Sequence, residues 1–179
     1  MKFLSKPFIA SALLAASTFV SAESESTTKM FSIGIASTAQ VLGYDDYYGT
    51  EDEFAGFGFS GTIAPTDNVA FQANFYSLEH DMYDEIELSG VEIIAYFGTG
   101  LESEGFKAYI GPGYYSETVE TPYTEYEASG LLLGAGIGYN WQYVALDLAL
   151  AFKNADDYAE EFNVDTTSIN AALKLSGRF

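Results

Sequence analysis

The chain has 179 residues, with seven basic side chains against 26 acidic ones and no cysteine. Such an excess of negative charge excludes nucleic acid as a partner, and the missing cysteines exclude disulfides as a source of stability. The length suits one domain with a sizeable core.

Residues 1–22 have the pattern of a secretory signal peptide. Lys2 and Lys6 precede an apolar run from Phe8 to Val20, and the small residues that end at Ala22 resemble a cleavage site. The run is shorter than the roughly 20 residues that a membrane-spanning helix needs. We expect removal after Ala22, which leaves one domain over 23–179 with five basic residues, 26 acidic ones and a net charge of −21.

The remainder of the chain alternates apolar and polar residues with period two and shows no sustained helical repeat. In the clearest stretch Leu146, Leu148 and Leu150 point one way, while Asp147 and Ala149 point the other. We predict eight strands, each about as long as a tilted strand that crosses a membrane. They lie near 29–42, 53–64, 69–78, 86–97, 106–116, 128–139, 143–153 and 166–179.

The connections between these strands alternate in length. The segments at 65–68, 98–105 and 140–142 are short or moderate, whereas those at 43–52, 79–85, 117–127 and 154–165 are longer. Short turns at one end and long loops at the other are typical of bacterial outer-membrane barrels.

The composition of the two strand faces distinguishes a membrane barrel from a soluble one. The polar face consists mainly of Gly, Ala, Ser, Thr, Asn, Gln and Tyr, which suits the filled interior of a narrow barrel better than a surface in water. We therefore predict an all-β fold, an eight-stranded antiparallel up-and-down transmembrane β-barrel in the bacterial outer membrane, surrounded by its lipid and monomeric. A soluble periplasmic ligand-binding barrel is the alternative.

One predicted strand is out of phase. Ile86 and Leu88 occupy even positions, but Val91 and Ile93 occupy odd ones. A β-bulge near Ser89 and Gly90 would restore the alternation.

The last strand runs to the carboxyl terminus, so it has to pair with the first strand to leave no open edge in the membrane. Together with the signal peptide, the alternating strands and the glycine-tyrosine stretches at 109–116 and 131–141, the final Phe179 resembles the small opacity-protein-like outer-membrane β-barrel family. The resemblance implies that Phe179, Leu175 and Leu173 form the signal read by the barrel-insertion machinery. Gly177 departs from that pattern, where a bulky residue is usual.

The four longer loops and their flanks hold 19 of the 26 acidic residues and no Lys or Arg. Two interpretations remain open: solvated loops that keep the protein soluble, or a surface that contacts divalent cations or basic ligands. The third loop contributes Glu117, Glu120, Glu125 and Glu127. The candidate surface residues in the other loops are Asp45, Asp46, Asp81, Asp84, Asp156, Asp157, Glu160 and Glu161.

Asp147 and Lys174 are predicted to face inward at nearly opposed positions and to form an ion pair, because a charge buried alone costs several kcal/mol. Glu92, Lys107 and Lys153 are expected to join this polar filling. Packed side chains rather than an ion path are expected in a barrel this narrow.

The sequence offers little chemistry for catalysis. Ser77, His80 and Asp81 lie within five residues, but Ser77 is expected to point toward lipid, and His80 is explained equally well as a solvated loop residue. No cofactor motif or zinc site is present in the sequence. We therefore expect a non-catalytic protein whose barrel anchors acidic, Tyr-rich loops for surface contact or envelope integrity. A lipid-modifying enzyme on the same barrel is the alternative.

Overall fold

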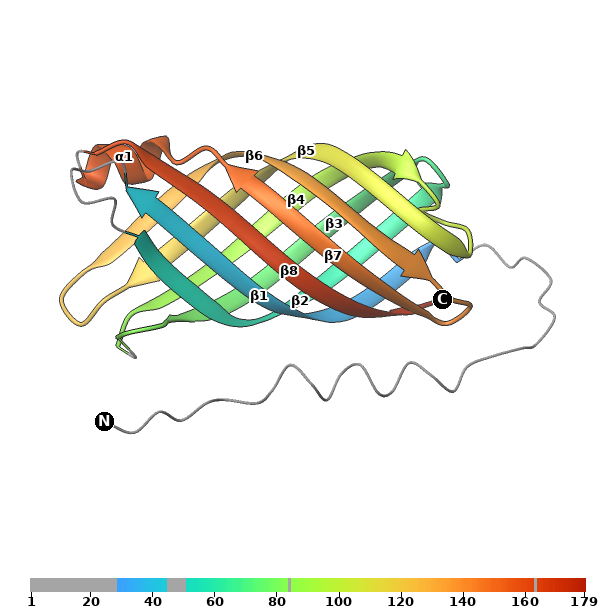
Figure 1. The fold of residues 1–179 in the computed structure, drawn as a ribbon, viewed down its shortest axis with the longest axis horizontal. Helices are drawn as coiled ribbons and strands as arrows, with labels where there is room; N and C mark the ends of the chain where they lie inside the picture. Colours follow the sequence, from blue (N-terminus) through green and yellow to red (C-terminus); the bar gives the residue numbers. More distant parts are fainter. Residues whose placement is uncertain (1–28, 45–50, 84, 163) are drawn as a thin grey trace.

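The computed structural model describes residues 29–44, 51–83, 85–162 and 164–179. These residues form one closed barrel of antiparallel strands in which each strand pairs with its neighbours in the chain (Figure 1). The predicted signal peptide lies outside the described residues. No helix in the described part of the chain is long and apolar enough to cross a membrane.

The barrel has eight strands in up-and-down order, as the alternation predicts. One short helix, α1, interrupts the last connection. The elements are β1 Phe31–Tyr44, β2 Glu51–Thr66, β3 Val69–His80, β4 Glu87–Thr99, β5 Gly105–Glu120, β6 Glu125–Asn140, β7 Val144–Lys153, α1 Asp156–Phe162 and β8 Thr166–Arg178.

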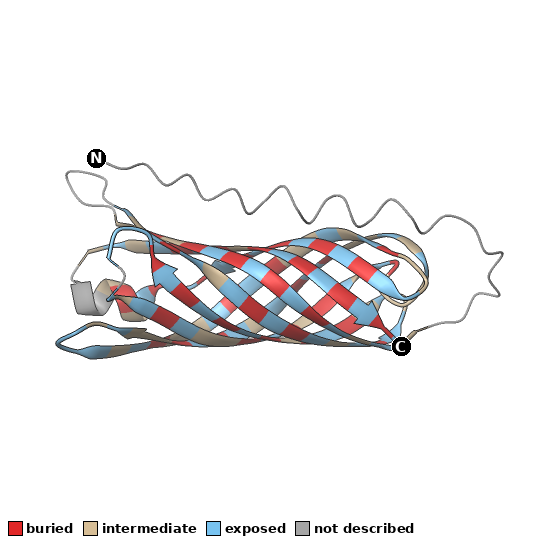
Figure 2. Ribbon diagram, turned by 90° about the horizontal axis from the view of Figure 1, so that it is seen from below, coloured by how far each residue is buried: buried red, intermediate tan, exposed pale blue. Residues whose placement is uncertain are grey.

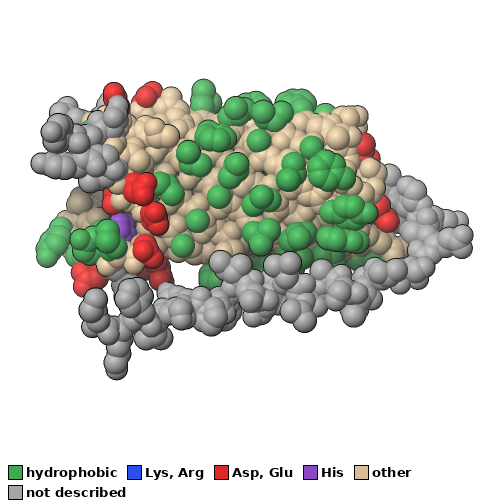
Figure 3. All heavy atoms as spheres, in the orientation of Figure 1, with side chains coloured by type: hydrophobic (Ala, Val, Ile, Leu, Met, Phe, Trp, Pro, Cys, Tyr) green, Lys and Arg blue, Asp and Glu red, His purple; other side chains and the backbone are tan. Residues whose placement is uncertain are grey.

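Burial alternates along the strands (Figure 2). One set of side chains therefore fills the barrel, and the other covers its outside. On β7, Leu148 is 51% exposed, whereas the neighbouring Ala149 is 6% exposed. Apolar side chains are spread over the visible middle of the outer surface, and acidic ones gather toward its ends (Figure 3). This arrangement confirms the predicted orientation of apolar residues outward and polar residues inward.

The barrel closes between the first and last strands, as predicted. β1 and β8 pair from Ser32 opposite Arg178 to Tyr44 opposite Thr166. Beyond β8, Phe179 exchanges two backbone hydrogen bonds with Phe31, at 3.1 and 3.0 Å, and their rings stack with centroids 6.3 Å apart. The terminal residue therefore completes the wall on the side of the short turns.

Strands β5 and β6 continue farther than the alternation suggests. They pair without interruption up to Glu120 opposite Glu125, so the third connection contains only residues 121–124 instead of 117–127. The predicted third loop is therefore wrong in extent, because these two strands extend beyond the apolar band of the wall.

The predicted β-bulge at Ser89 and Gly90 is wrong. β4 keeps one register with β3 from Val69–Phe97 to Glu79–Glu87, and Leu88 points inward with full burial. Gly90 instead makes room for an aromatic ring, because a Cβ added there would lie 2.5 Å from Oη of Tyr76. An apolar Leu88 inside the barrel accounts for the broken alternation.

The Gly90 contact predicts the effect of a single added methyl group. Gly90→Ala should lower the free energy of unfolding by about 1–3 kcal/mol, because Tyr76 is held in place by polar partners and cannot yield freely. Gly61→Ala is the matched control, since nothing lies within 4 Å of its added Cβ, and it should change stability by less than about 0.5 kcal/mol. Urea unfolding in detergent micelles measures both, and equal effects of the two substitutions would contradict the packing described for Tyr76.

Candidate functional site

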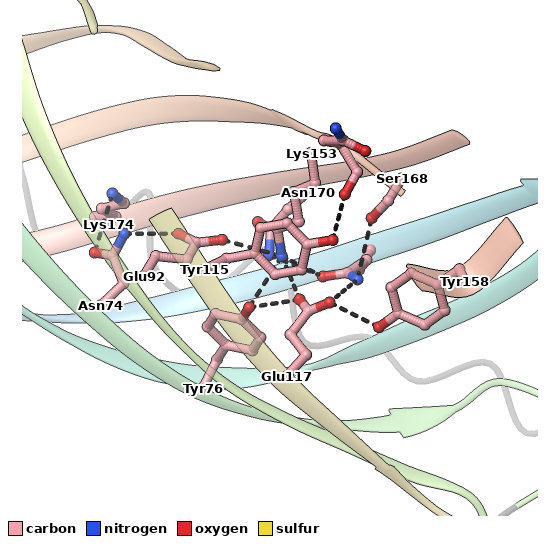
Figure 4. Close-up of polar contacts among 12 residues, drawn as sticks. Asn74, Tyr76, Glu92, Tyr115, Glu117, Lys153, Tyr158, Ser168, Asn170 and Lys174 are labelled. Atoms are coloured by element: carbon pink, nitrogen blue, oxygen red, sulfur yellow. Dashed lines mark hydrogen bonds and ion pairs between the residues drawn. The ribbon is translucent and has the colours of Figure 1, made fainter. Parts of the chain in front are cut away.

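A buried network of charged and polar side chains fills the barrel beneath the end that carries the longer loops (Figure 4). Lys153 on β7 lies at its centre, with a fully buried side chain. Its Nζ forms ion pairs with Glu117 on β5 and, at 3.1 Å, with Glu92 on β4. It also donates to Oε1 of Gln40 at 2.8 Å and to Oη of Tyr76 at 2.9 Å.

Glu117 is the second centre of this network. Its carboxylate accepts hydrogen bonds from Tyr76 at 2.5 Å, Tyr158 at 2.8 Å and Gln40 at 3.1 Å, and its side chain is fully buried. The sequence interpretation of Glu117 as a loop acid is therefore wrong. Because alternation on β5 continues past Tyr115, the odd-numbered Glu117 faces inward.

Helix α1 lies over the barrel mouth and contributes Tyr158 to the network. The Tyr158 side chain is fully buried, and burial beside the Glu117 carboxylate raises the pKa of its hydroxyl well above the usual range. The Asp157 carboxylate accepts a hydrogen bond from the backbone N–H of Ser129 at 2.8 Å, and Tyr126 donates to the Asp157 carbonyl. These contacts attach α1 to β6.

Deeper in the barrel, the predicted pair of Asp147 and Lys174 does not form as an ion pair. The two residues are opposed in the β7–β8 register and are both buried, as expected. Asp147 instead pairs with Lys107 at 2.8 Å, while Lys174 donates to Oε1 of Gln72 at 2.5 Å and to Oδ1 of Asn74 at 3.4 Å. The long lysine side chains reach past the opposed position to acceptors on other strands.

The polar filling leaves little empty space. Small cavities of about 20 and 30 Å³ lie beside these residues, enough for single water molecules. Glu92, Lys107 and Lys153 belong to the filling, as predicted. The described residues, packed in this way, leave no lumen for a solute of ordinary size.

The connection between β4 and β5 folds across the other end of the barrel. Asp67 accepts hydrogen bonds from the N–H of Gly100 and from both the N–H and hydroxyl of Ser103, at 3.0, 3.0 and 2.6 Å. These hydrogen bonds lower the pKa of the Asp67 carboxyl, and the bond from the Ser103 hydroxyl has the largest effect. Asn140 donates to the carbonyls of Gly100 and Ser103, and Arg178 donates to that of Trp141 at 2.6 Å.

His80 is buried, which corrects its interpretation as a solvated loop residue. Its ring is 5% exposed and faces inward at the end of β3, with Nε2 3.3 Å from Oδ1 of Asp52. Ser77 points outward, as predicted, and Asp81 is exposed. Ser77 and His80 therefore lie on opposite sides of the barrel wall and do not form a nucleophile and base pair.

The outer face at the long-loop end carries a row of glutamates, one on each of four adjacent strands. Glu79, Glu87, Glu120 and Glu125 are successive partners in the β3–β4, β4–β5 and β5–β6 registers, and all four are exposed. Like charges that are directly opposed repel one another. We call these four residues the glutamate row. The alternation in the sequence does not predict their alignment, which depends on the strand registers.

Only some of the candidate surface residues lie in the part of the chain that the structure describes. Asp45, Asp46 and Asp84 lie outside the described residues. Asp156 is exposed, Asp157 is used to fasten α1, and Glu160 and Glu161 belong to α1. No three histidine or acidic side chains among the described residues are placed to hold a metal ion.

Comparison with solved structures identifies the fold. The attachment invasion locus protein Ail of Yersinia pestis is similar over 86% of this chain and 100% of its own, with a TM-score of 0.58 and 16% identity. Neisserial surface protein A is similar over 82% of this chain and 97% of its own, with a TM-score of 0.55 and 13% identity. OprG of Pseudomonas aeruginosa is similar over 85% of this chain and 97% of its own, with a TM-score of 0.52 and 11% identity. No protein-family model and no curated protein matches the chain.

These likenesses confirm the predicted fold class, a small eight-stranded β-barrel of the outer-membrane type. Since the identities are all below one fifth, the likenesses establish the architecture alone.

The observed partners of Asp147 predict the outcome of two double-mutant cycles. Asp147→Asn combined with Lys107→Met should show a coupling energy of about 1–3 kcal/mol, because the two side chains are in direct contact. The same aspartate substitution combined with Lys174→Met should show a smaller one. Urea unfolding of the five variants measures both couplings, and a coupling to Lys174 that equals or exceeds that to Lys107 would contradict the observed pairing.

Proposed function

We propose that this chain is a non-catalytic outer-membrane surface protein whose barrel anchors an acidic outer rim. By the rim we mean the exposed carboxylates at the long-loop end, which include the glutamate row. The rim contacts cationic groups of other molecules, either divalent cations or basic protein segments. The glutamate row carries this proposal, because four aligned carboxylates repel one another unless positive charge approaches them.

The distribution of basic residues supports this preference for cations. The mature chain would hold only five, of which Lys107, Lys153 and Lys174 lie inside the barrel. Lys29 and Arg178 lie at the end with the short turns. The described part of the long-loop end therefore presents carboxylates without a neighbouring lysine or arginine.

The exposed rim favours loose electrostatic attraction over tight chelation. Its acidic side chains are exposed and spread over several strands, and such contacts are weak individually and screened by salt. One structure of Ail holds the heparin analogue sucrose octasulfate. A ligand with that negative charge would be repelled by the rim of this chain, so we propose the opposite charge preference.

Two of the sequence-based proposals concern the membrane itself. Leu173, Leu175 and Phe179 are 42, 50 and 59% exposed on the outer face, so that both lipid and the barrel-insertion machinery can reach them. We retain them as the proposed insertion signal. We also retain the signal peptide at 1–22 as the proposed route of export.

The residues that suggested the alternative function, lipid modification, do not lie together. Ser77 faces the lipid side while His80 is turned inward and bound to Asp52. The separation of these side chains favours the non-catalytic proposal.

The proposal predicts a position-specific loss of cation binding. Glu87→Gln with Glu120→Gln, at the centre of the glutamate row, should weaken binding of a fluorescent lysine decapeptide about three- to tenfold, because two attractive charges are removed. The measurement is fluorescence anisotropy of the folded protein in nonionic detergent at low salt.

The matched control is Glu102→Gln with Glu104→Gln, which makes the same change in net charge at the opposite end of the barrel. This control should bind as the wild type does. Equal weakening in both variants would mean that net charge alone attracts the peptide, and no weakening in either would contradict a role for the rim.

A further inference from the structure

His80, the single histidine of the chain, lies where β3 ends and the turn toward β4 begins. Its two ring nitrogens have different partners. Nδ1 accepts a hydrogen bond from the backbone N–H of Met82 at 3.1 Å, and Nε2 lies 3.3 Å from Oδ1 of Asp52 on β2.

This pair of contacts determines which nitrogen carries the proton. A backbone N–H can only donate, so Nδ1 must offer its lone pair to Met82 and the ring proton must be on Nε2, directed at Asp52. The other carboxylate oxygen of Asp52 accepts a hydrogen bond from the Tyr44 hydroxyl at 2.8 Å. The Nε2 side of the ring is therefore held by strands β1 and β2.

The Nδ1 side of the ring holds the turn. The Tyr83 ring lies 5.2 Å from the imidazole, and the Phe54 ring lies 5.1 Å from it on another side. Met82 and Tyr83 are themselves 70 and 58% exposed. The base of the turn is held by backbone hydrogen bonds from Asp81 to Glu53 and from Ile86 to Tyr83. The bond from the Met82 N–H to Nδ1 is the polar link between the exposed apolar tip and the buried ring.

We propose that His80 is a proton-binding switch that releases the Met82 amide from the buried ring in acid. A second proton on the ring has to bind at Nδ1, the nitrogen that now accepts from Met82. Two N–H donors would then face each other, and the hydrogen bond would be lost. The imidazolium would at the same time be attracted more strongly to Asp52, so the ring would stay in place while the Met82 amide lost its acceptor.

The groups around the ring are consistent with a second proton that binds at Nδ1. Asp52 is the charged group in direct contact with the ring, and Tyr44 is hydrogen-bonded to Asp52. The aromatic rings of Tyr83, in the turn, and of Phe54, on β2, pack against the imidazole. Histidine is the side chain that ordinarily gains its second proton between about pH 5 and 8. The switch would change the order of the exposed tip when the ring gains its second proton.

This inference does not depend on the proposed cation-binding function. It concerns the order of the turn in the protein alone, with no ligand present. Failure of the peptide-binding experiment would leave it intact, and the reverse also holds.

The test is the hydrogen-exchange rate of the Met82 amide in the full folded protein in detergent micelles, measured by NMR at about pH 5 and about pH 7.5. The reference variant is His80→Asn, whose Oδ1 takes the place of Nδ1 and does not titrate. Comparing the two proteins at the same pH cancels the intrinsic pH dependence of exchange.

At the higher pH the two proteins should exchange at similar rates. At the lower pH the wild type should exchange about tenfold faster than His80→Asn, since it alone has lost the acceptor. An unchanged ratio between the two pH values, or a Met82 amide without protection in the wild type at the higher pH, would overturn the proposal.

A second variant keeps the test decisive if His80→Asn does not fold. Asp52→Asn retains the histidine and the bond from the Met82 N–H, so the protection factor of the Met82 amide should still fall from the higher pH to the lower one. An unchanged protection factor between the two pH values would overturn the proposal.

Discussion

The whole structure depends on the need to satisfy every backbone N–H and carbonyl in the wall, because hydrocarbon offers no hydrogen-bond partner. Strand pairing around the full circle meets this need, and the contact between Phe31 and Phe179 completes it at the last residue. Closure in turn separates the side chains into two environments. Alternate residues face lipid, and the rest are enclosed in a space too narrow for bulk water.

The enclosed charges must therefore find partners within the barrel. Glu117, Lys153 and Glu92 form one connected group, and Asp147 and Lys107 form another. Tyrosine hydroxyls and amide side chains satisfy the remaining positions, as Tyr76 and Gln40 do around Lys153. Breaking one of these pairs would leave a buried charge, at a cost of about 3–5 kcal/mol. Among the described residues the interior is a packed, stabilising core, and this is why we propose the rim and turns as the surface for contact with other molecules.

Strand number, order and orientation could be predicted because period-two alternation records directly which residues face lipid. Leu148 and Ala149 illustrate this, and Phe179 indicated where the barrel closes. The partner of Asp147 could not be predicted, because a lysine side chain spans several strand positions. The burial of Glu117 and His80 was predictable in principle, since both continue the inward phase of their strands, but loop-like composition concealed it. The acceptor role of Nδ1 in His80 depends on turn geometry that no sequence pattern records.

Depth-dependent fluorescence quenching tests the orientation of the wall most directly, and the absence of native cysteines makes single labels possible. A label at Leu148→Cys, in reconstituted vesicles, should be quenched by nitroxides on lipid acyl chains and protected from aqueous iodide. A label at Tyr123→Cys, where the side chain is 97% exposed in the turn between β5 and β6, should show the reverse. Strong iodide quenching at position 148, without quenching by the lipid nitroxides, would contradict the membrane-facing wall.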